Sequence, residues 1–286
     1  MAKKAEPNLP TRVTPALSVP SYLTQYEGYE ADMAEQNASM GEYVIVPRMK
    51  IIQGTSHENL TRDFGVGAVI FSPGNALVVK HDSTTATNKS DTFTFNPLFQ
   101  YTEFMKWKDL KDKDEETPMI LDRSFDRTGE LAIRARDPKR RFERYGPLDQ
   151  NTRQPKFQAR YIEFLNFLGF IRGDHPLANT PCAISFSRGE FSTGKNFISA
   201  VQMRKTPIFT QIWDFNSAFK SRGTERKWWG WEYSPAEEPN ISNDEFQSMR
   251  EQHLGLKKAF NDKLLQVDHT DFDQDEAAEP DGSGQF

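Results

Sequence analysis

The chain has 286 residues and a net charge of −5, and only 36% of its residues are hydrophobic although 22 are phenylalanine. No apolar run approaches the roughly 20 residues that a membrane span needs, so we expect a soluble protein without a membrane partner. The single cysteine, Cys182, excludes an intramolecular disulfide framework and is typical of a reducing compartment. We therefore expect a globular, cytoplasmic protein.

The negative charge is unevenly distributed along the chain. Residues 1–42 carry a net charge of −3, and residues 268–286 carry seven acids and no lysine or arginine, so residues 43–267 carry +5. A basic body between acidic ends is typical of proteins whose body contacts nucleic acid and whose tail has a regulatory or partner-binding role.

The predicted elements follow one another in a simple order. Residues 1–42 contain four prolines and no sustained periodicity, which predicts a flexible N-terminal arm. Short apolar runs separated by turn residues fill residues 43–240 and predict a β-rich nucleic-acid-binding core; residues 72–75 (Ser-Pro-Gly-Asn), for example, predict a hairpin turn. N-cap residues and early acids predict a C-terminal helix over 241–267. Residues 268–286 lack the apolar content to pack and predict a disordered acidic tail.

The many short strands, with one inserted helix near residues 196–203 and one late helix, favour a mainly β fold over an alternating α/β sheet. Among closed β folds, we expect an OB-like barrel, the oligonucleotide- and oligosaccharide-binding type, with disordered termini. No internal repeat at periods of 20–50 residues is visible.

Two clusters of cations and aromatics are the strongest candidates for nucleic-acid contact. Cations neutralise phosphates and release counterions, and aromatic faces stack on unpaired bases. Because a duplex hides its base faces, this mixture favours a single-stranded ligand. The first cluster comprises Arg134, Arg136, Lys139, Arg140, Arg141, Phe142, Arg144 and Tyr145, and continues into Arg153, Lys156, Phe157 and Arg160. The second consists of Lys220, Arg222, Arg226 and Lys227 and leads directly into Trp228, Trp229, Trp231 and Tyr233. Of these, Arg226, Lys227, Trp229 and Trp231 are predicted to bind nucleic acid, and Lys195 adds to the phosphate-contacting surface.

The same aromatics could instead form the hydrophobic core, since large aromatics dominate cores as well. In a strand, a period of two places Trp229 and Trp231 on one face and Trp228 on the other. The sequence leaves open which of these faces points inward.

The tail ends in an aromatic, Phe286, after a run of acids. A basic, aromatic-rich body with such a tail resembles the bacteriophage-type single-stranded DNA-binding proteins of replication and recombination. The resemblance implies that no cofactor is needed, that no reaction is catalysed, and that the tail competes with DNA and recruits replication proteins such as polymerase and helicase or primase. The tail residues that would do so are Asp271, Asp273, Asp275, Glu276 and Phe286. Residues 46–53 also resemble the opening strand of a widespread group of phage proteins.

Two other functions stay open. Residues 189–195 (Gly-Glu-Phe-Ser-Thr-Gly-Lys) match the spacing of a phosphate-binding loop and suggest a nucleotide-dependent enzyme, although Asn196 replaces the Ser or Thr that would bind magnesium. The second is a phage interaction factor whose acidic ends bind a basic protein, without DNA binding. The five histidines show no metal-ligand spacing, so we expect no metal site. Homo-oligomerisation and the choice between DNA and RNA also stay open.

Overall fold

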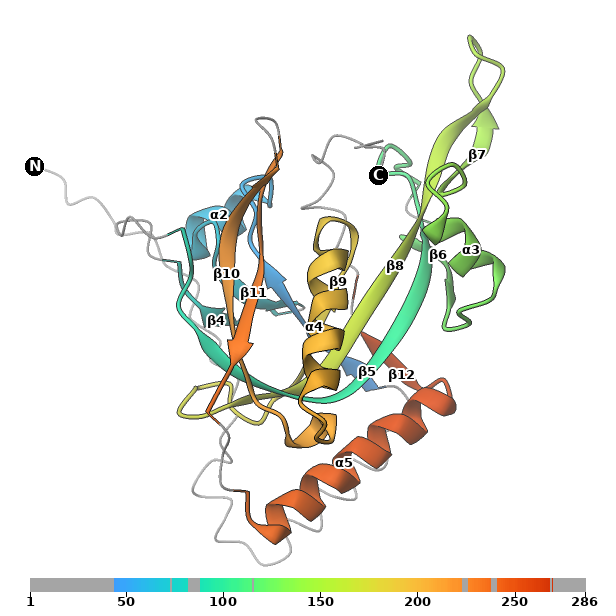
Figure 1. The fold of residues 1–286 in the computed structure, drawn as a ribbon. Helices are drawn as coiled ribbons and strands as arrows, with labels where there is room; N and C mark the ends of the chain where they lie inside the picture. The colour runs from blue at the N-terminus through green and yellow to red at the C-terminus, as the bar shows by residue number, and fades with distance from the viewer. Residues whose placement is uncertain are drawn as a thin grey trace, which may run out of the picture.

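The structure is a computed structural model that describes residues 44–72, 74–81, 88–114, 116–222, 226–237, 241–267 and 269 (Figure 1). The predicted N-terminal arm and nearly all of the predicted acidic tail, including Asp271, Asp273, Asp275, Glu276 and Phe286, lie outside these residues.

Strands dominate the described residues. The strands are β1 (Val44–Val46), β2 (Arg48–Ile51), β3 (Val69–Ser72), β4 (Leu77–Val79), β5 (Phe93–Trp107), β6 (Ile120–Ser124), β7 (Phe142–Leu148), β8 (Pro155–Arg172), β9 (Pro181–Phe186), β10 (Trp213–Arg222), β11 (Arg226–Pro235) and β12 (Leu265–Val267). The helices are α2 (Glu58–Phe64), α3 (Glu130–Arg136), α4 (Phe191–Met203) and α5 (Asn243–Asn261), with short 3-10 turns η1 (Arg188–Glu190) and η2 (Ile208–Thr210). The mainly β prediction is confirmed, and α4 and α5 lie where the inserted and late helices were expected, whereas the short helices α2 and α3 were not predicted.

Ten of the strands form one sheet. Its order is β11-β10-β5-β8-β9-β2-β3-β4, with β6 paired to β5 and β7 paired to β8. The pairs are antiparallel except β2–β9. Strands β3 and β4 pair on either side of the turn predicted at residues 72–75, of which Pro73 lies outside the described residues. Two strands at the ends of the described chain, β1 and β12, form a separate parallel pair. The predicted C-terminal helix over 241–267 is shorter than expected: α5 ends at Asn261, and its last predicted residues form the three-residue strand β12.

The sheet is open, so the predicted closed, OB-like barrel is not found. Among the described residues, β11 and β4 are the ends of the strand path and do not pair with each other. Side chains bridge part of the gap instead. The amide of Gln53 donates to the Trp229 carbonyl oxygen (2.8 Å) and accepts from the Trp229 N–H (2.9 Å), and the Ser217 hydroxyl donates to the Gly67 carbonyl. The two bonds from Gln53 satisfy backbone groups of Trp229 that the unpaired edge of β11 would otherwise expose.

The main hydrophobic core lies inside the curve of this sheet, where α4 packs (Figure 1). Phe197 of α4 is fully buried at its centre. Its ring centroid lies 4.7–5.2 Å from those of Phe167, Trp213, Phe215 and Tyr233. A sequence with many aromatics thus fills a core between strands from both ends of the sheet.

The long strand β8 has different neighbours on its two faces, because successive side chains of a strand alternate in direction. Leu165 and Phe167 belong to the main core with α4. Leu168 packs instead with β1 and β12, and Phe170 packs with residues of α5. Within the described residues, none of the helices combines the length and apolar composition that crossing a membrane requires.

Candidate nucleic-acid interface

The first basic cluster begins in α3 with Arg134 and Arg136, and the rest of it forms a hairpin that projects away from the body, at the upper right of Figure 1. Strand β7 pairs with the first part of β8, from Phe142 opposite Arg160 to Leu148 opposite Pro155. We call residues 138–160 the basic arm. These residues include seven lysines or arginines and two acids, a net charge of +5. The rest of residues 43–267 is therefore neutral overall, and the arm holds the entire net positive charge of the body.

Five cations of the arm are exposed; Arg140 is paired with Glu130, and the other four are Lys139, Arg144, Arg153 and Lys156. Within the described residues none of the four forms an ion pair with a carboxylate. Arg144 makes one long hydrogen bond to the Pro155 carbonyl (3.4 Å), and the Lys156 ammonium lies 5.4 Å from the ring centroid of Phe157. A phosphate could approach these side chains without first displacing a protein carboxylate.

The aromatics of the arm are partly exposed and held in place. The Tyr145 hydroxyl donates to Asp112 (2.8 Å) and accepts from the backbone N–H of Asp109 (3.1 Å). Burial is the main cause that raises the pKa of Tyr145 to about 12, so the phenol stays neutral. Its ring lies 5.7 Å from that of Phe157, on the opposite strand. The pair provides two fixed aromatic side chains on the same hairpin as the exposed cations.

Other arginines of the predicted cluster are engaged in ion pairs at the base of the arm. Arg134 contacts Glu130 (2.7 Å) and Glu143 (3.0 Å), and Arg140 also contacts Glu130 (2.8 Å). Arg136 forms a bidentate pair with Glu163. These contacts attach α3 to the arm and to β8. At these three arginines, which were predicted to contact phosphates, a phosphate would have to replace an existing carboxylate partner.

Two further members of the first cluster lie near the base of the arm. Arg160 is half-buried with its guanidinium 5.6 Å from the ring centroid of Phe142, directly opposite in the ladder. Arg141 is half-buried, and its backbone carbonyl accepts from the N–H of Tyr161.

Two predicted stacking residues, Trp229 and Trp231, lie in the hydrophobic core. They are 8% and 4% exposed and belong to the same core cluster as Phe215 and Phe197. Their face of β11 points inward because the sheet curves over α4, so neither ring is accessible to a base. This corrects the prediction.

The cationic members of the second cluster lie nearer the surface. Lys227 is exposed, and the structure describes the backbone of Arg226 in β11 but not its side chain.

The motif that resembled a phosphate-binding loop folds differently. Residues 189–195 form the end of η1 and the first turn of α4 rather than an open loop. Gly194 is buried, and a Cβ there would lie 2.6 Å from Cβ of Phe186, so this glycine allows close packing of α4 on β9. Lys195 is exposed, with its ammonium 5.4 Å from the ring centroid of Phe191. Residues 191–195 are helical, so they do not form the loop that surrounds a phosphate in that motif.

Glu190 in the same segment has a structural role that the sequence did not reveal. Its carboxylate accepts hydrogen bonds from the Lys220 ammonium (2.8 and 3.0 Å), the Trp228 indole (2.7 Å) and the Trp231 backbone N–H (2.9 Å). One mostly buried carboxylate therefore joins the start of α4 to the β10–β11 hairpin. The partners of Glu190 are 30 to 41 positions away in the sequence, so only the folded structure reveals this contact.

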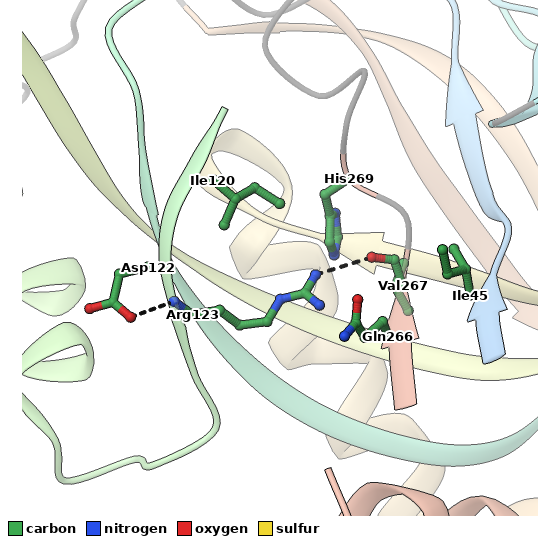
Figure 2. Close-up of a pocket in the computed structure, with 7 residues that line it drawn as sticks. All are labelled: Ile45, Ile120, Asp122, Arg123, Gln266, Val267 and His269. Carbon is green, nitrogen blue, oxygen red and sulfur yellow. Dashed lines mark hydrogen bonds between the residues drawn. The ribbon is translucent and has the colours of Figure 1, made fainter. Parts of the chain in front are cut away.

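A cavity of about 310 Å³ lies between β6 and β12, where the described chain ends (Figure 2). Arg123 extends across it, donates to the Val267 carbonyl (3.3 Å) and pairs with buried Glu103 (2.6 Å). His269 is also buried, 3.4 Å from Glu103 and 4.3 Å (ring centroids) from Phe164. Burial lowers the pKa of His269, which favours the neutral ring. These contacts fix the point from which the acidic tail begins.

No metal centre is evident in the part of the chain that the structure describes, since no three His, Cys, Asp or Glu side chains gather there in a suitable way. Cys182 is buried, and burial raises the pKa of its thiol far above the ordinary value. A reactive thiolate is therefore not part of the site.

Comparison with known proteins places the chain in a phage family. A family model described as "Pam3 phage gp34-like protein" matches residues 14–259. The chain belongs to this family. The match agrees with the expected phage origin, and it includes the basic arm and Glu190 but ends before β12 and the acidic tail. No curated protein and no solved structure matches the chain.

Proposed function

We propose that this phage gp34-like protein binds and protects single-stranded DNA during phage replication or recombination, and that the basic arm is its main contact surface. The observation that supports this most strongly is the concentration of charge: the arm carries +5 while the rest of residues 43–267 is neutral overall. Binding of this kind requires no catalysed reaction and no cofactor.

The arrangement of the arm favours a single strand over a duplex. Exposed cations flank Tyr145 and Phe157, so that phosphates and unpaired bases have partners on the same hairpin. For a single strand, each neutralised phosphate contributes a slope of about −0.7 in log K against log salt concentration. If the four unpaired cations each bind one phosphate, affinity should fall about 50-fold between 50 and 200 mM salt.

The acidic tail is suited to regulate this surface. His269 packs on Phe164, which lies four residues from Arg160 along β8, a distance of about 13 Å. Residues 270–286 can span at most about 60 Å, which is enough to reach the arm. We propose that the tail competes with DNA for the arm and that Phe286 recruits replication proteins once DNA has displaced the tail.

The decisive test is a titration of a fluorescent 30-nucleotide single strand at several salt concentrations. The arm variant Arg144→Glu/Arg153→Glu/Lys156→Glu should bind at least about 30-fold more weakly at low salt, and its salt slope should be about 2 units shallower. Arg250→Glu/Lys257→Glu/Lys258→Glu is the matched control: it makes the same change in charge on exposed residues of α5. The control should bind within about threefold of the unaltered protein once net charge is screened.

Two results would overturn the proposal. The first is the absence of single-strand binding by the unaltered protein even at low salt; capture of a basic partner protein would then favour the interaction factor. The second is an equal loss of affinity in the arm and control variants, which would show a non-specific charge effect. Deletion of residues 270–286 should raise affinity, and an unchanged value would contradict the competing tail.

A further inference from the structure

A second contact with the strand can be located on the β10–β11 hairpin, and this inference rests on the proposed function. Phe219 of β10 is 39% exposed. Every other Phe, Tyr or Trp in the described part of the chain is more buried than this residue. A single exposed apolar side chain is ordinary on protein surfaces, so its surroundings decide whether it is a site.

Phe219 is exposed because its hairpin extends beyond the core. Phe215 lies four residues earlier on the same face of β10 and is fully buried. Four pairs further along the ladder than Phe215, Phe219 lies opposite Trp229, with ring centroids 5.7 Å apart and a tilt of 61°. The inward-facing aromatic row of the hairpin thus continues past the core to the rim of the sheet, where Phe219 is its last member.

The ring of Phe219 packs against Trp229, a side chain that is itself held in place by its neighbours. Trp229 is 8% exposed and packs against the ring of His81, with centroids 4.4 Å apart. A Cβ on Gly67 would lie 2.8 Å from the Trp229 indole, so the backbone of Gly67 also presses against this side chain. An aromatic residue held by such neighbours loses little side-chain freedom when a base stacks on it, which favours binding.

A cation lies beside this ring. The next pair on the same face, toward the tip, is Ser221 opposite Lys227. Lys227 is therefore the diagonal cross-strand neighbour of Phe219, a position within reach of long side chains, and it is exposed. Phe219 and Lys227 offer the same two contacts as the basic arm: an aromatic face and a positive charge.

We infer that Phe219 stacks on an unpaired base of the bound strand while Lys227 contacts a neighbouring phosphate. The β10–β11 hairpin and the basic arm extend toward the same end of the molecule, the top of Figure 1. A strand long enough to reach from one to the other contacts both, whereas a short oligonucleotide contacts one at a time. Binding therefore has two parts, a charge-dominated contact at the arm and a stacking contact at the rim.

Phe219→Ala in the full chain tests the stacking contact, with Leu254→Ala as the control because Leu254 is an exposed apolar residue of α5. Loss of one stacked base should weaken binding of a 30-nucleotide strand about 5- to 100-fold. Phe219→Trp should restore most of the affinity, and Leu254→Ala should leave it unchanged. Thermal melting of each variant establishes that it is folded.

Crosslinking provides a second, direct measurement. A 30-nucleotide strand that contains 5-iodouracil should crosslink on irradiation to the peptide that includes Phe219, and Phe219→Ala should remove that crosslink.

The two proposals fail in different ways. Normal affinity of Phe219→Ala, together with weak binding by the arm variant, would overturn the stacking site and leave the proposed function intact. Absence of binding by the unaltered protein would overturn both.

Discussion

The basic arm and the β10–β11 hairpin are both antiparallel pairs secured by one glutamate, yet their aromatic residues have different surroundings. Glu143 at the arm base contacts Lys106 (2.9 Å), Arg134 and the Tyr161 hydroxyl, and its side chain is 36% exposed. Glu190, which holds the β10–β11 hairpin, is 14% exposed. The arm rings remain partly exposed, whereas Trp229 and Trp231 are buried.

The difference shows that the position of a hairpin in the sheet determines whether its aromatic residues pack in the core or remain exposed. The β10–β11 hairpin lies at one end of the curved sheet, so its inward face covers the core, and Phe219 is exposed where the hairpin extends past the core. The arm branches from β8 beyond the core, so neither of its faces is covered to the same extent. A cluster of cations and aromatics therefore indicates nucleic-acid contact only when the fold leaves its aromatic face accessible.

The largest expected effect distinguishes the two hairpins by stability. Trp231→Ala should lower the free energy of unfolding by about 3–5 kcal/mol, because it removes a large buried ring from the core. Phe157→Ala on the arm should cost about 1 kcal/mol, because its ring is partly exposed and contacts mainly Tyr145. Urea unfolding measures both values. Similar losses in the two variants would contradict the division into a core hairpin and an exposed arm.

The second prediction concerns the glutamate that holds the β10–β11 hairpin. Glu190→Ala should destabilise the protein by about 3 kcal/mol, because it leaves the Lys220 ammonium and two N–H donors without their partner. Glu232→Ala is the matched control: it removes a carboxylate from an exposed pair with Lys89 on the same hairpin and should cost less than about 0.5 kcal/mol. Equal losses of stability in the two variants would mean that Glu190 does not stabilise the contact between α4 and the β10–β11 hairpin.

Much of the fold could be predicted from the sequence, because local patterns determine it. The turn at residues 72–75, the helix near residues 196–203 and the mainly β class all follow from turn chemistry and periodicity. The open sheet could not be predicted, because closure depends on whether β11 meets β4, two strands separated by almost 150 residues. The side-chain bridge between Gln53 and Trp229 has no sequence signature either.

The candidate site was predictable in part for the same reason. The exposed cations of the arm belong to a continuous cluster in the sequence, and the structure keeps them together at the surface. The direction of the tryptophans in residues 228–231 depends on which face of β11 meets α4, and the sequence contains only their alternation. Phe219 is isolated in the sequence, and only its place at the rim makes it a candidate.

The third prediction separates the packing role of α4 from nucleotide binding. Gly194→Ala should destabilise the protein by about 1–3 kcal/mol, because the new methyl group would overlap Phe186. Lys195→Ala, one residue further, should change stability by less than about 0.5 kcal/mol, because Lys195 is exposed. Neither substitution should affect ATP hydrolysis, because we expect none. Magnesium-dependent hydrolysis that Lys195→Ala abolishes would contradict the packing role and restore the enzyme alternative.

The smallest expected effect is the pH dependence of the arm base. Hydrogen bonds from Tyr161 and then Lys106 lower the pKa of Glu143 below its ordinary value of 4.5. In the unfolded chain this carboxyl group binds its proton near pH 4.5, whereas in the folded protein it stays ionised to a lower pH. The contribution of Glu143 to stability is therefore fully present above about pH 4.5, and it disappears as the pH falls through the pKa that Glu143 has in the folded protein.

Glu143→Gln isolates this contribution from those of other acids whose pKa values are also lowered. The melting temperature of the unaltered protein should exceed that of Glu143→Gln by a constant, small amount above pH 5, equivalent to less than about 1 kcal/mol because the side chain is partly exposed. The difference should shrink as the pH is lowered below 4.5. A difference in melting temperature that stays constant down to pH 3.5 would show that the charge of Glu143 does not stabilise the arm. Glu143 would then resemble Glu190 in its position at a hairpin but not in its contribution to stability.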